Sequence, residues 1–116
     1  MKKDIIDINE STIKKFVEAL RPIDEEIRKQ VDIGYSYHSK VKVVELYQIR
    51  PKWDNPKENQ KLPFAKIRYY KNQNFWKIFW FRASGSWDPY EPKPTATNLE
   101  EILATIKEDK HGCFFG

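Results

Sequence analysis

The feature that most constrains this chain is a pair of aromatic-rich segments, residues 64–71 and 75–83, that are separated by a short polar stretch. Both segments alternate side chains with the two-residue period of a β-strand, which predicts an antiparallel hairpin with its turn at Asn72-Gln73. A register slip of one residue would place lysine and arginine in the apolar row, so the hydrophobic pattern specifies the pairing. In the favoured register the facing apolar pairs are Tyr69 with Trp76, Ile67 with Ile78, and Ala65 with Trp80.

The other side of this hairpin combines aromatic and basic side chains. So much apolar surface is not expected to face water on a monomer, and something should cover it. Three covers stay open: a loop or the C-terminal segment 113–116, a second copy packed sheet to sheet, or a single-stranded nucleic acid whose bases stack on the rings. The side chains on this side are Phe64, Lys66, Arg68, Tyr70, Phe75, Lys77, Phe79 and Phe81.

The flanking segments predict an α+β fold. Apolar residues recur with helical spacing over residues 13–20 and 99–106, and acidic residues after Pro22 favour a short helix over residues 23–30. We expect Asn9 or Ser11 to cap the first helix, and Thr97 with Glu100 or Asn98 with Glu101 to cap the last.

Two further strands are predicted over residues 31–38 and 41–50, with Ile33 beside Leu46 and Tyr35 beside Val44. Residues 50–63 and 84–97 each contain three prolines, which predicts loops. Residues 1–116 are therefore expected to form a single domain: a four-stranded antiparallel meander sheet with two N-terminal helices and one C-terminal helix, in the order α-α-β-β-β-β-α.

Basic charge is concentrated in the middle of the chain. The net charge is +4, but residues 40–82 hold eleven basic and three acidic residues, a local net of +8. Such a field attracts anionic partners, although lysines on strand edges also keep those edges from pairing with other chains. The first seven residues lack an apolar targeting segment, and a single cysteine excludes a disulfide framework, so we expect a cytoplasmic protein without a membrane partner.

Catalytic and metal-binding patterns are sparse. The two histidines and Cys113 do not form a metal-ligand spacing, and the four glycines do not form a phosphate loop, so we predict no catalytic residue, metal or cofactor. One polar group stands out at the ends of the second and fourth strands. If those ends meet, Arg50, Arg82, Trp53, Trp80 and Trp87 would line a pocket for a carboxylate or phosphate. The alternative pairs Arg82 with Glu100 or Glu101 and leaves the tryptophans in the core.

Several segments in their order along the chain resemble a bacterial family known as domain of unknown function 3024. They are ELYQIRPKW at residues 45–53, Ala65-Lys66, WKIFWFRA at residues 76–83, Trp87 with Tyr90, and CFFG at residues 113–116. The resemblance implies no activity, because the family has none assigned. The family pattern places an Asp, a Lys and a His around the tryptophan, where this chain has Ser84, Ser86 and Asp88. The resemblance thus implies that any chemistry of that cluster is lacking here.

Together these patterns favour a self-associating interaction or regulatory module, with enzymatic activity least favoured. The contact would use the aromatic residues Phe64, Tyr70, Phe75, Phe79, Phe81, Phe114 and Phe115. The alternative is a binder of single-stranded nucleic acid or of a phosphate or carboxylate ligand, through Arg50, Trp53, Lys66, Arg68, Lys77, Trp80, Arg82 and Trp87.

Overall fold

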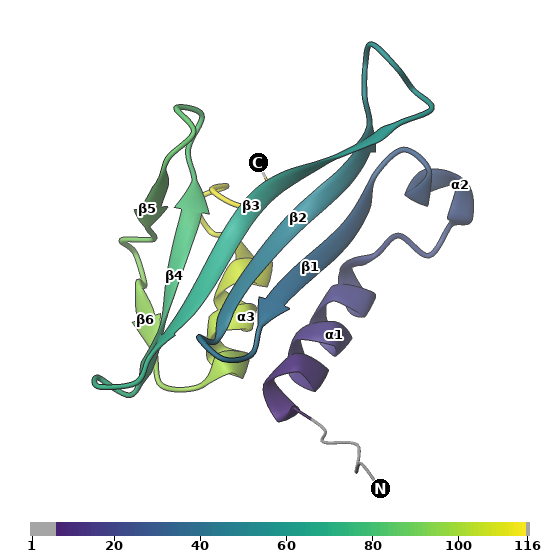
Figure 1. The fold of residues 1–116 in the computed structure, drawn as a ribbon. Coiled ribbons are helices and arrows are strands. Elements are labelled where there is room, and N and C mark those ends of the chain that lie inside the picture. The colour runs from purple at the N-terminus through teal and green to yellow at the C-terminus, as the bar shows by residue number, and fades with distance from the viewer. Residues whose placement is uncertain (1–6, 116) are drawn as a thin grey trace, which may run out of the picture.

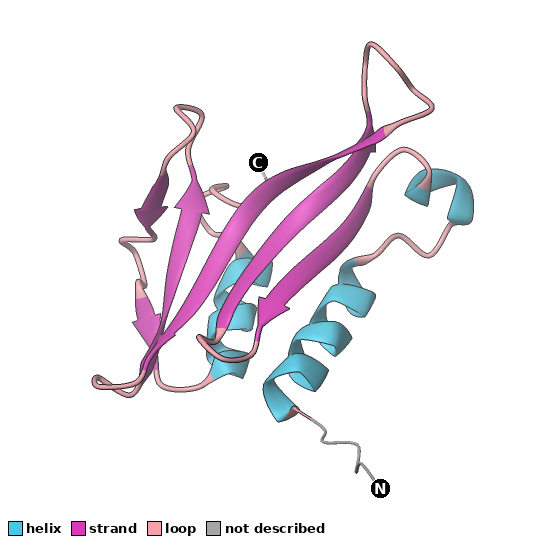
Figure 2. Ribbon diagram, in the orientation of Figure 1, coloured by secondary structure: helices cyan, strands magenta, loops and turns pink. Residues whose placement is uncertain are grey.

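A twisted antiparallel sheet with two helices packed on one of its faces forms the body of the protein in a computed structural model, which describes residues 7–115 (Figure 1). Figure 2 distinguishes the helices from the strands and shows that the strands dominate. The predicted α+β class and antiparallel sheet are confirmed, but six strands replace the predicted four. The elements are α1 (Ile8–Leu20), α2 (Glu25–Arg28), β1 (Asp32–His38), β2 (Val43–Pro51), β3 (Asn59–Tyr70), β4 (Phe75–Phe81), β5 (Trp87–Pro89), β6 (Thr95–Ala96) and α3 (Leu99–Glu108).

Helices α1 and α3 pack on the same face of the sheet and contact each other. Their apolar stripes meet the inward side chains of β2, β3 and β4 in one hydrophobic core. Each fully buried aliphatic side chain there contributes about 1.5–3 kcal/mol relative to exposure. The largest fully buried side chains are those of Ile13, Val44, Leu46, Ile67, Ile78, Ile102 and Ile106.

The helix ends agree only partly with the sequence prediction. Asp7, rather than Asn9 or Ser11, caps α1, because its carboxylate accepts the N–H groups of Asn9 and Glu10 at 2.9 and 3.4 Å. Asn98 caps α3 by accepting the Glu101 N–H at 2.8 Å, which is half of one predicted capping box; the Glu101 carboxylate bonds Lys93 instead. The expected helix over residues 23–30 is reduced to the four residues of α2. No helix within residues 7–115 is long and apolar enough to span a membrane.

The register of β3 with β4 agrees with the prediction in all three pairs: Tyr69 with Trp76, Ile67 with Ile78, and Ala65 with Trp80. In contrast, the predicted pairing of β1 with β2 was wrong by two residues, because Tyr35 pairs with Leu46 and Tyr37 with Val44. The connection includes Lys42, whose φ of 51° is left-handed, so β2 begins at Val43 and not at residue 41. A shift of two residues preserves the face of every side chain.

A β-bulge in β3 contradicts the predicted position of Phe64. Leu46 pairs with Ala65 while Tyr47 pairs with Pro63, so Phe64 is the extra residue. Phe64 and Ala65 are both buried, and the Phe64 ring lies 5.1 Å from that of Phe115. A bulge also accommodates proline within a sheet, which explains why β3 extends back to residue 59 through a segment that was predicted to be a loop.

The predicted loop over residues 84–97 contributes two short strands that both pair with β4. Between them the edge of β4 remains bonded, since the Tyr90 N–H donates to the Ile78 carbonyl at 3.0 Å and the Ile78 N–H donates to the Pro94 carbonyl at 2.8 Å. The Tyr90 side chain is buried beneath the sheet. This segment therefore closes one edge of the sheet and fixes the position of Trp87.

Candidate functional site

The face of the sheet opposite the helices carries the predicted basic and aromatic side chains, and Figure 1 looks onto it, with α3 behind the strands. The cross-strand pairs place these residues together, because paired residues of adjacent strands point to the same face. Two residues outside the predicted set also lie on this face: Tyr47, which alternates with the buried Leu46, and Lys61, which the bulge turns to this side. We call this surface the open face, and define it by Glu45, Tyr47, Lys61, Lys66, Arg68, Tyr70, Phe75, Lys77, Phe79, Phe81 and Trp87.

The C-terminal segment does not cover the open face. Phe114 packs on Tyr90 with ring centroids 4.9 Å apart, and Phe115 packs on Phe64, both on the helix side of the sheet. Of the three predicted covers, folding back of the tail is thus contradicted for residues 113–115, while Gly116 lies outside the described residues. Phe64 and Phe114 are buried in the core, so neither lies on the surface predicted for self-association. The aromatic rings of the open face itself are only half-buried.

Cations lie over the rings at the centre of the open face. The Nζ atom of Lys66 is 6.0 Å from the Phe79 ring centroid and 5.7 Å from that of Trp87, and Lys77 Nζ is 5.5 Å from Phe79. Phe81 meets Trp87 edge to face at 4.9 Å. The open face therefore combines aromatic rings with cations that lie within about 6 Å of them.

The positive charge of the open face is largely unbalanced. Arg68 on β3 is the direct partner of Lys77 on β4, so like charges face each other. Lys66 is opposite Glu45, which is the single acidic residue of the open face against four cations. Within residues 7–115, Lys66, Arg68 and Lys77 make no salt bridge with a carboxylate. Like charges directly opposite each other destabilise a sheet, so the pair of Arg68 with Lys77 is electrostatically unfavourable in the free protein.

The structure does not bring Arg50 and Arg82 together. The ends of β2 and β4 diverge in the twisted sheet, each extending toward a different loop (Figure 1). Arg82 donates to Asp88 at 2.7 Å, and its guanidinium lies 5.5 Å from the Trp80 ring. The predicted pocket is therefore wrong, and so is the predicted pairing of Arg82 with Glu100 or Glu101.

Arg50 instead lies beside the loop between β2 and β3. Its Nε atom donates to Gln48 at 2.9 Å, and it lines a shallow hollow with Trp53, whose side chain is 91% exposed. Lys52 in the same hollow is paired with Glu58 at 3.1 Å. Only two of the five residues expected to form one ligand pocket thus share a site.

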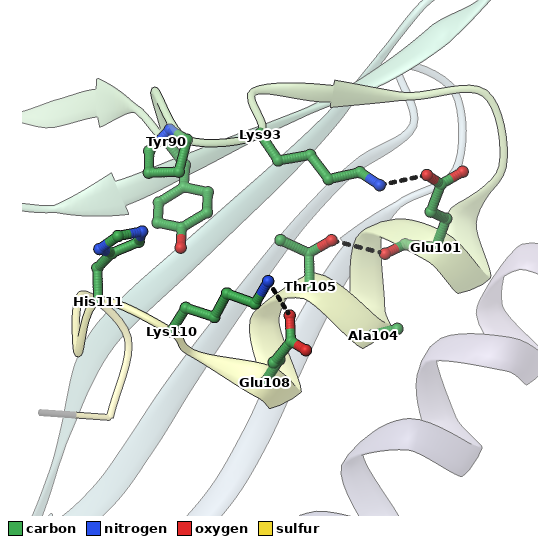
Figure 3. A pocket seen from close by; sticks show the side chains of 9 residues that line it. Tyr90, Lys93, Glu101, Ala104, Thr105, Glu108, Lys110 and His111 are labelled. Carbon is green, nitrogen blue, oxygen red and sulfur yellow. Dashed lines mark hydrogen bonds and ion pairs between the residues drawn. The ribbon is translucent and has the colours of Figure 1, made fainter.

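A hollow of about 460 Å³ beside α3 is lined by paired charges (Figure 3). Lys93 bonds Glu101, Lys110 lies 3.8 Å from Glu108, and the Thr105 hydroxyl donates to the Glu101 carbonyl. Because these cations already have carboxylate partners, this hollow lacks the free charge found on the open face.

The one thiol and the candidate metal ligands of the described residues do not form a site. Burial and the charge of Asp109 raise the pKa of the Cys113 thiol, which disfavours the reactive thiolate. Among the residues from 7 to 115, no three His, Cys, Asp or Glu side chains lie close enough to hold a metal ion.

A basic hollow that the sequence did not indicate lies between the β1–β2 and β3–β4 turns. It has a volume of about 650 Å³, and its lining includes Lys40, Lys42, Arg68 and Lys71. The excess of basic residues over residues 40–82 was visible in the sequence. The sequence did not show that four of these basic residues gather at one end of the sheet, because the two turns that carry most of them lie side by side only after the strands have paired.

Comparisons with known proteins give a family but not an activity. The model of a family described as Domain of unknown function (DUF3024) matches residues 2–116 of the chain. No curated protein and no solved structure matches it.

Proposed function

Because the chain belongs to the DUF3024 family, a domain of unknown function, its activity has to be inferred from the molecule itself, and we propose that the open face binds single-stranded nucleic acid. The face combines the two features that such proteins use: aromatic rings for stacking of bases and cations for the phosphates. The helices pack on the other face of the sheet, and the rings of the open face are only half-buried.

The rings support stacking of more than one base. Phe75, Phe79 and Phe81 alternate along β4 with Lys77, and Trp87 lies beside Phe81 on the neighbouring strand. Residues two apart on a strand are about 6.6 Å apart, so successive rings can receive separate unstacked bases. Each base stacked on an aromatic side chain is typically worth about 1–3 kcal/mol.

The observation that carries the proposal is the direct pairing of Arg68 with Lys77. Their repulsion is relieved when a phosphate lies between them, and Lys66 extends the same cationic row. A second copy packed face to face would bring together two surfaces of the same net positive charge, which adds to the repulsion. Charge complementarity therefore favours a polyanion over a second copy.

Fluorescence anisotropy with labelled oligothymidine tests the proposal. We expect binding at low salt that weakens steeply as salt rises, because neutralised phosphates release counterions. Lys66→Glu should weaken binding, and loss of one phosphate contact should reduce the log–log salt slope by about 0.7. Quenching of tryptophan fluorescence on binding would be consistent with stacking at Trp87.

Lys14→Glu provides the matched control, since it makes the same charge change on the exposed side of α1. It should leave affinity and slope close to wild type. Lys77→Gln, which preserves the side-chain stem over Phe79, covers the case in which Lys66→Glu fails to fold. Absence of binding by the folded wild-type protein at low salt would refute the proposal.

Self-association of the open face is a second candidate, supported by the half-buried rings of Tyr70, Phe75, Phe79 and Phe81. Size exclusion with light scattering measures the oligomeric state, and its dependence on salt distinguishes self-association from nucleic-acid binding. High salt screens the cations, so a dimer formed through this face should strengthen as salt rises, whereas nucleic-acid binding weakens. A monomer at high micromolar concentration in both low and high salt would refute self-association.

A further inference from the structure

The basic hollow between the β1–β2 and β3–β4 turns continues the cationic row of the open face. Arg68 belongs to both, since it lines the hollow and also pairs with Lys77 on the face. The hollow holds four cations, Lys40, Lys42, Arg68 and Lys71, and no carboxylate is among the residues that line it. Within the described residues, these four cations also have no salt-bridge partner.

A backbone hydrogen bond joins the connection between β1 and β2 to the end of β3. The Lys42 carbonyl accepts the N–H of Tyr69 at 3.1 Å, which ties the end of the first connection to β3. Lys42 adopts a φ of 51°, a conformation that costs a non-glycine residue about 1–2 kcal/mol. The Arg68 guanidinium lies 5.5 Å from the Tyr70 ring, which limits its freedom. The cations are thus gathered by the fold at the end of the sheet, rather than spread along it.

We propose that this hollow binds the terminal phosphate of the single-stranded nucleic acid that lies on the open face. This inference rests on the proposed function. A terminal phosphate monoester carries a charge of about −1.5 to −2 at neutral pH, whereas each internal phosphodiester carries one charge. Four cations without a neighbouring acid match the more highly charged group. Asn72 and Gln73 also line this hollow, and a side-chain amide can donate hydrogen bonds to phosphate oxygens.

The position of the hollow also fits the end of a nucleic-acid strand rather than its middle. β4 extends from Phe75, next to the turn, to Phe81, which is about 20 Å of strand at 3.3 Å per residue. A nucleic acid with its end in the hollow would therefore pass over Lys77 and Phe79 before it reaches Phe81 and Trp87. The hollow would fix the register of the strand, and the rings would supply contacts that do not depend on base identity.

Competition binding with oligothymidines that differ only at their ends tests this inference. Three probes are needed: one with a 5′-phosphate, one with a 3′-phosphate, and one with hydroxyl groups at both ends. We expect the protein to prefer one phosphorylated end by about tenfold, which corresponds to an additional hydrogen-bonded ion contact. The variant Lys40→Ser/Lys71→Ser should abolish this preference while it binds the hydroxyl-ended probe within about twofold of wild type.

Lys14→Ser/Lys15→Ser is the control, because it removes two exposed lysines from α1 and leaves the hollow intact. It should retain the end preference. Inorganic phosphate should compete with the phosphorylated probe more than with the hydroxyl-ended one. Equal affinity for all three probes would overturn the inference and leave the proposed function standing. Failure to bind any probe would instead refute the proposed function, and this inference with it.

Discussion

Arg68 on β3 and Lys77 on β4 are direct cross-strand partners on the open face, and the described residues place no carboxylate in salt-bridge contact with either. Opposite charges would stabilise this position, and many neutral pairs would be tolerated there. The free protein therefore contains a local repulsion, and an anionic ligand would relieve it.

A double-mutant cycle should measure this repulsion. We expect Arg68→Gln and Lys77→Gln to be non-additive, with a repulsive coupling of about 0.2–1 kcal/mol in the free energy of unfolding. Each charge also lies near an aromatic ring, and the cycle cancels those separate contributions. Urea unfolding at low and moderate salt provides the measurement. The coupling should shrink as salt rises, and a coupling of attractive sign would show that the pair is not repulsive.

Gly34→Ala should destabilise the protein by about 1–3 kcal/mol, because a Cβ atom at this position would lie 2.6 Å from the Tyr47 ring. The ring is held by the hydrogen bond from the Tyr47 hydroxyl to the Tyr35 carbonyl at 3.1 Å and by Lys61 above it. Urea unfolding of Gly34→Ala alone and together with Tyr47→Val measures the effect. The substitution should cost little once the ring is removed; an equal cost in both backgrounds would exclude the clash as its cause.

Asp109→Ala should lower the free energy of unfolding by about 1–3 kcal/mol, because the Asp109 carboxylate accepts the N–H groups of Phe114 and Phe115 at 3.0 and 2.9 Å. Asp109 also has a φ of 45°, which alanine adopts poorly. Asp109→Asn keeps an acceptor oxygen and tolerates that conformation, so it should cost less. Alkylation of Cys113 should accelerate in Asp109→Ala as the tail loosens. Unchanged stability would mean that aromatic packing alone holds the tail.

Acid should weaken the protein through Asp32. Arg21 donates two hydrogen bonds of 2.9 Å to its carboxylate, and they hold the pKa of Asp32 below the ordinary value of 3.8. A lowered folded-state pKa contributes stability above the unfolded value, and this is lost as pH falls through the folded value. Asp32→Asn should therefore be less stable than wild type at neutral pH, and the difference should vanish in strong acid.

Denaturant midpoints across this pH range give the measurement. Glu58→Gln is the control, because its pair with Lys52 is exposed and contributes little. A constant difference between Asp32→Asn and wild type at every pH would exclude the ion pair as the origin of the effect.

The parts of the fold that were predictable are those whose signals are local. The connection between β3 and β4 is short, and a slip would bury Lys77 or Arg68, so the register followed from the hydrophobic pattern. The apolar stripes of α1 and α3 likewise required a sheet face to cover. Both predictions needed only neighbouring residues.

The remaining features depend on contacts between distant segments. The bulge at Phe64 arises where β3 meets β2, and the strands β5 and β6 form only because the edge of β4 is free to bond them. Their prolines indicated loops, and a three-residue strand carries too little pattern to oppose that signal. For the same reason the hollow around Lys42 and Lys71 was not expected, since its two turns are brought together by pairing.

The bulge reverses the alternation of side chains within one strand. Lys61 and Lys66 are separated by an odd number of positions, yet both reach the open face, because Phe64 adds one residue between them. Deletion of a single residue from this stretch would exchange inside for outside in one half of β3. Aligned relatives with a gap here should thus be compared by the side of the sheet each residue occupies, and not by its place in the numbering.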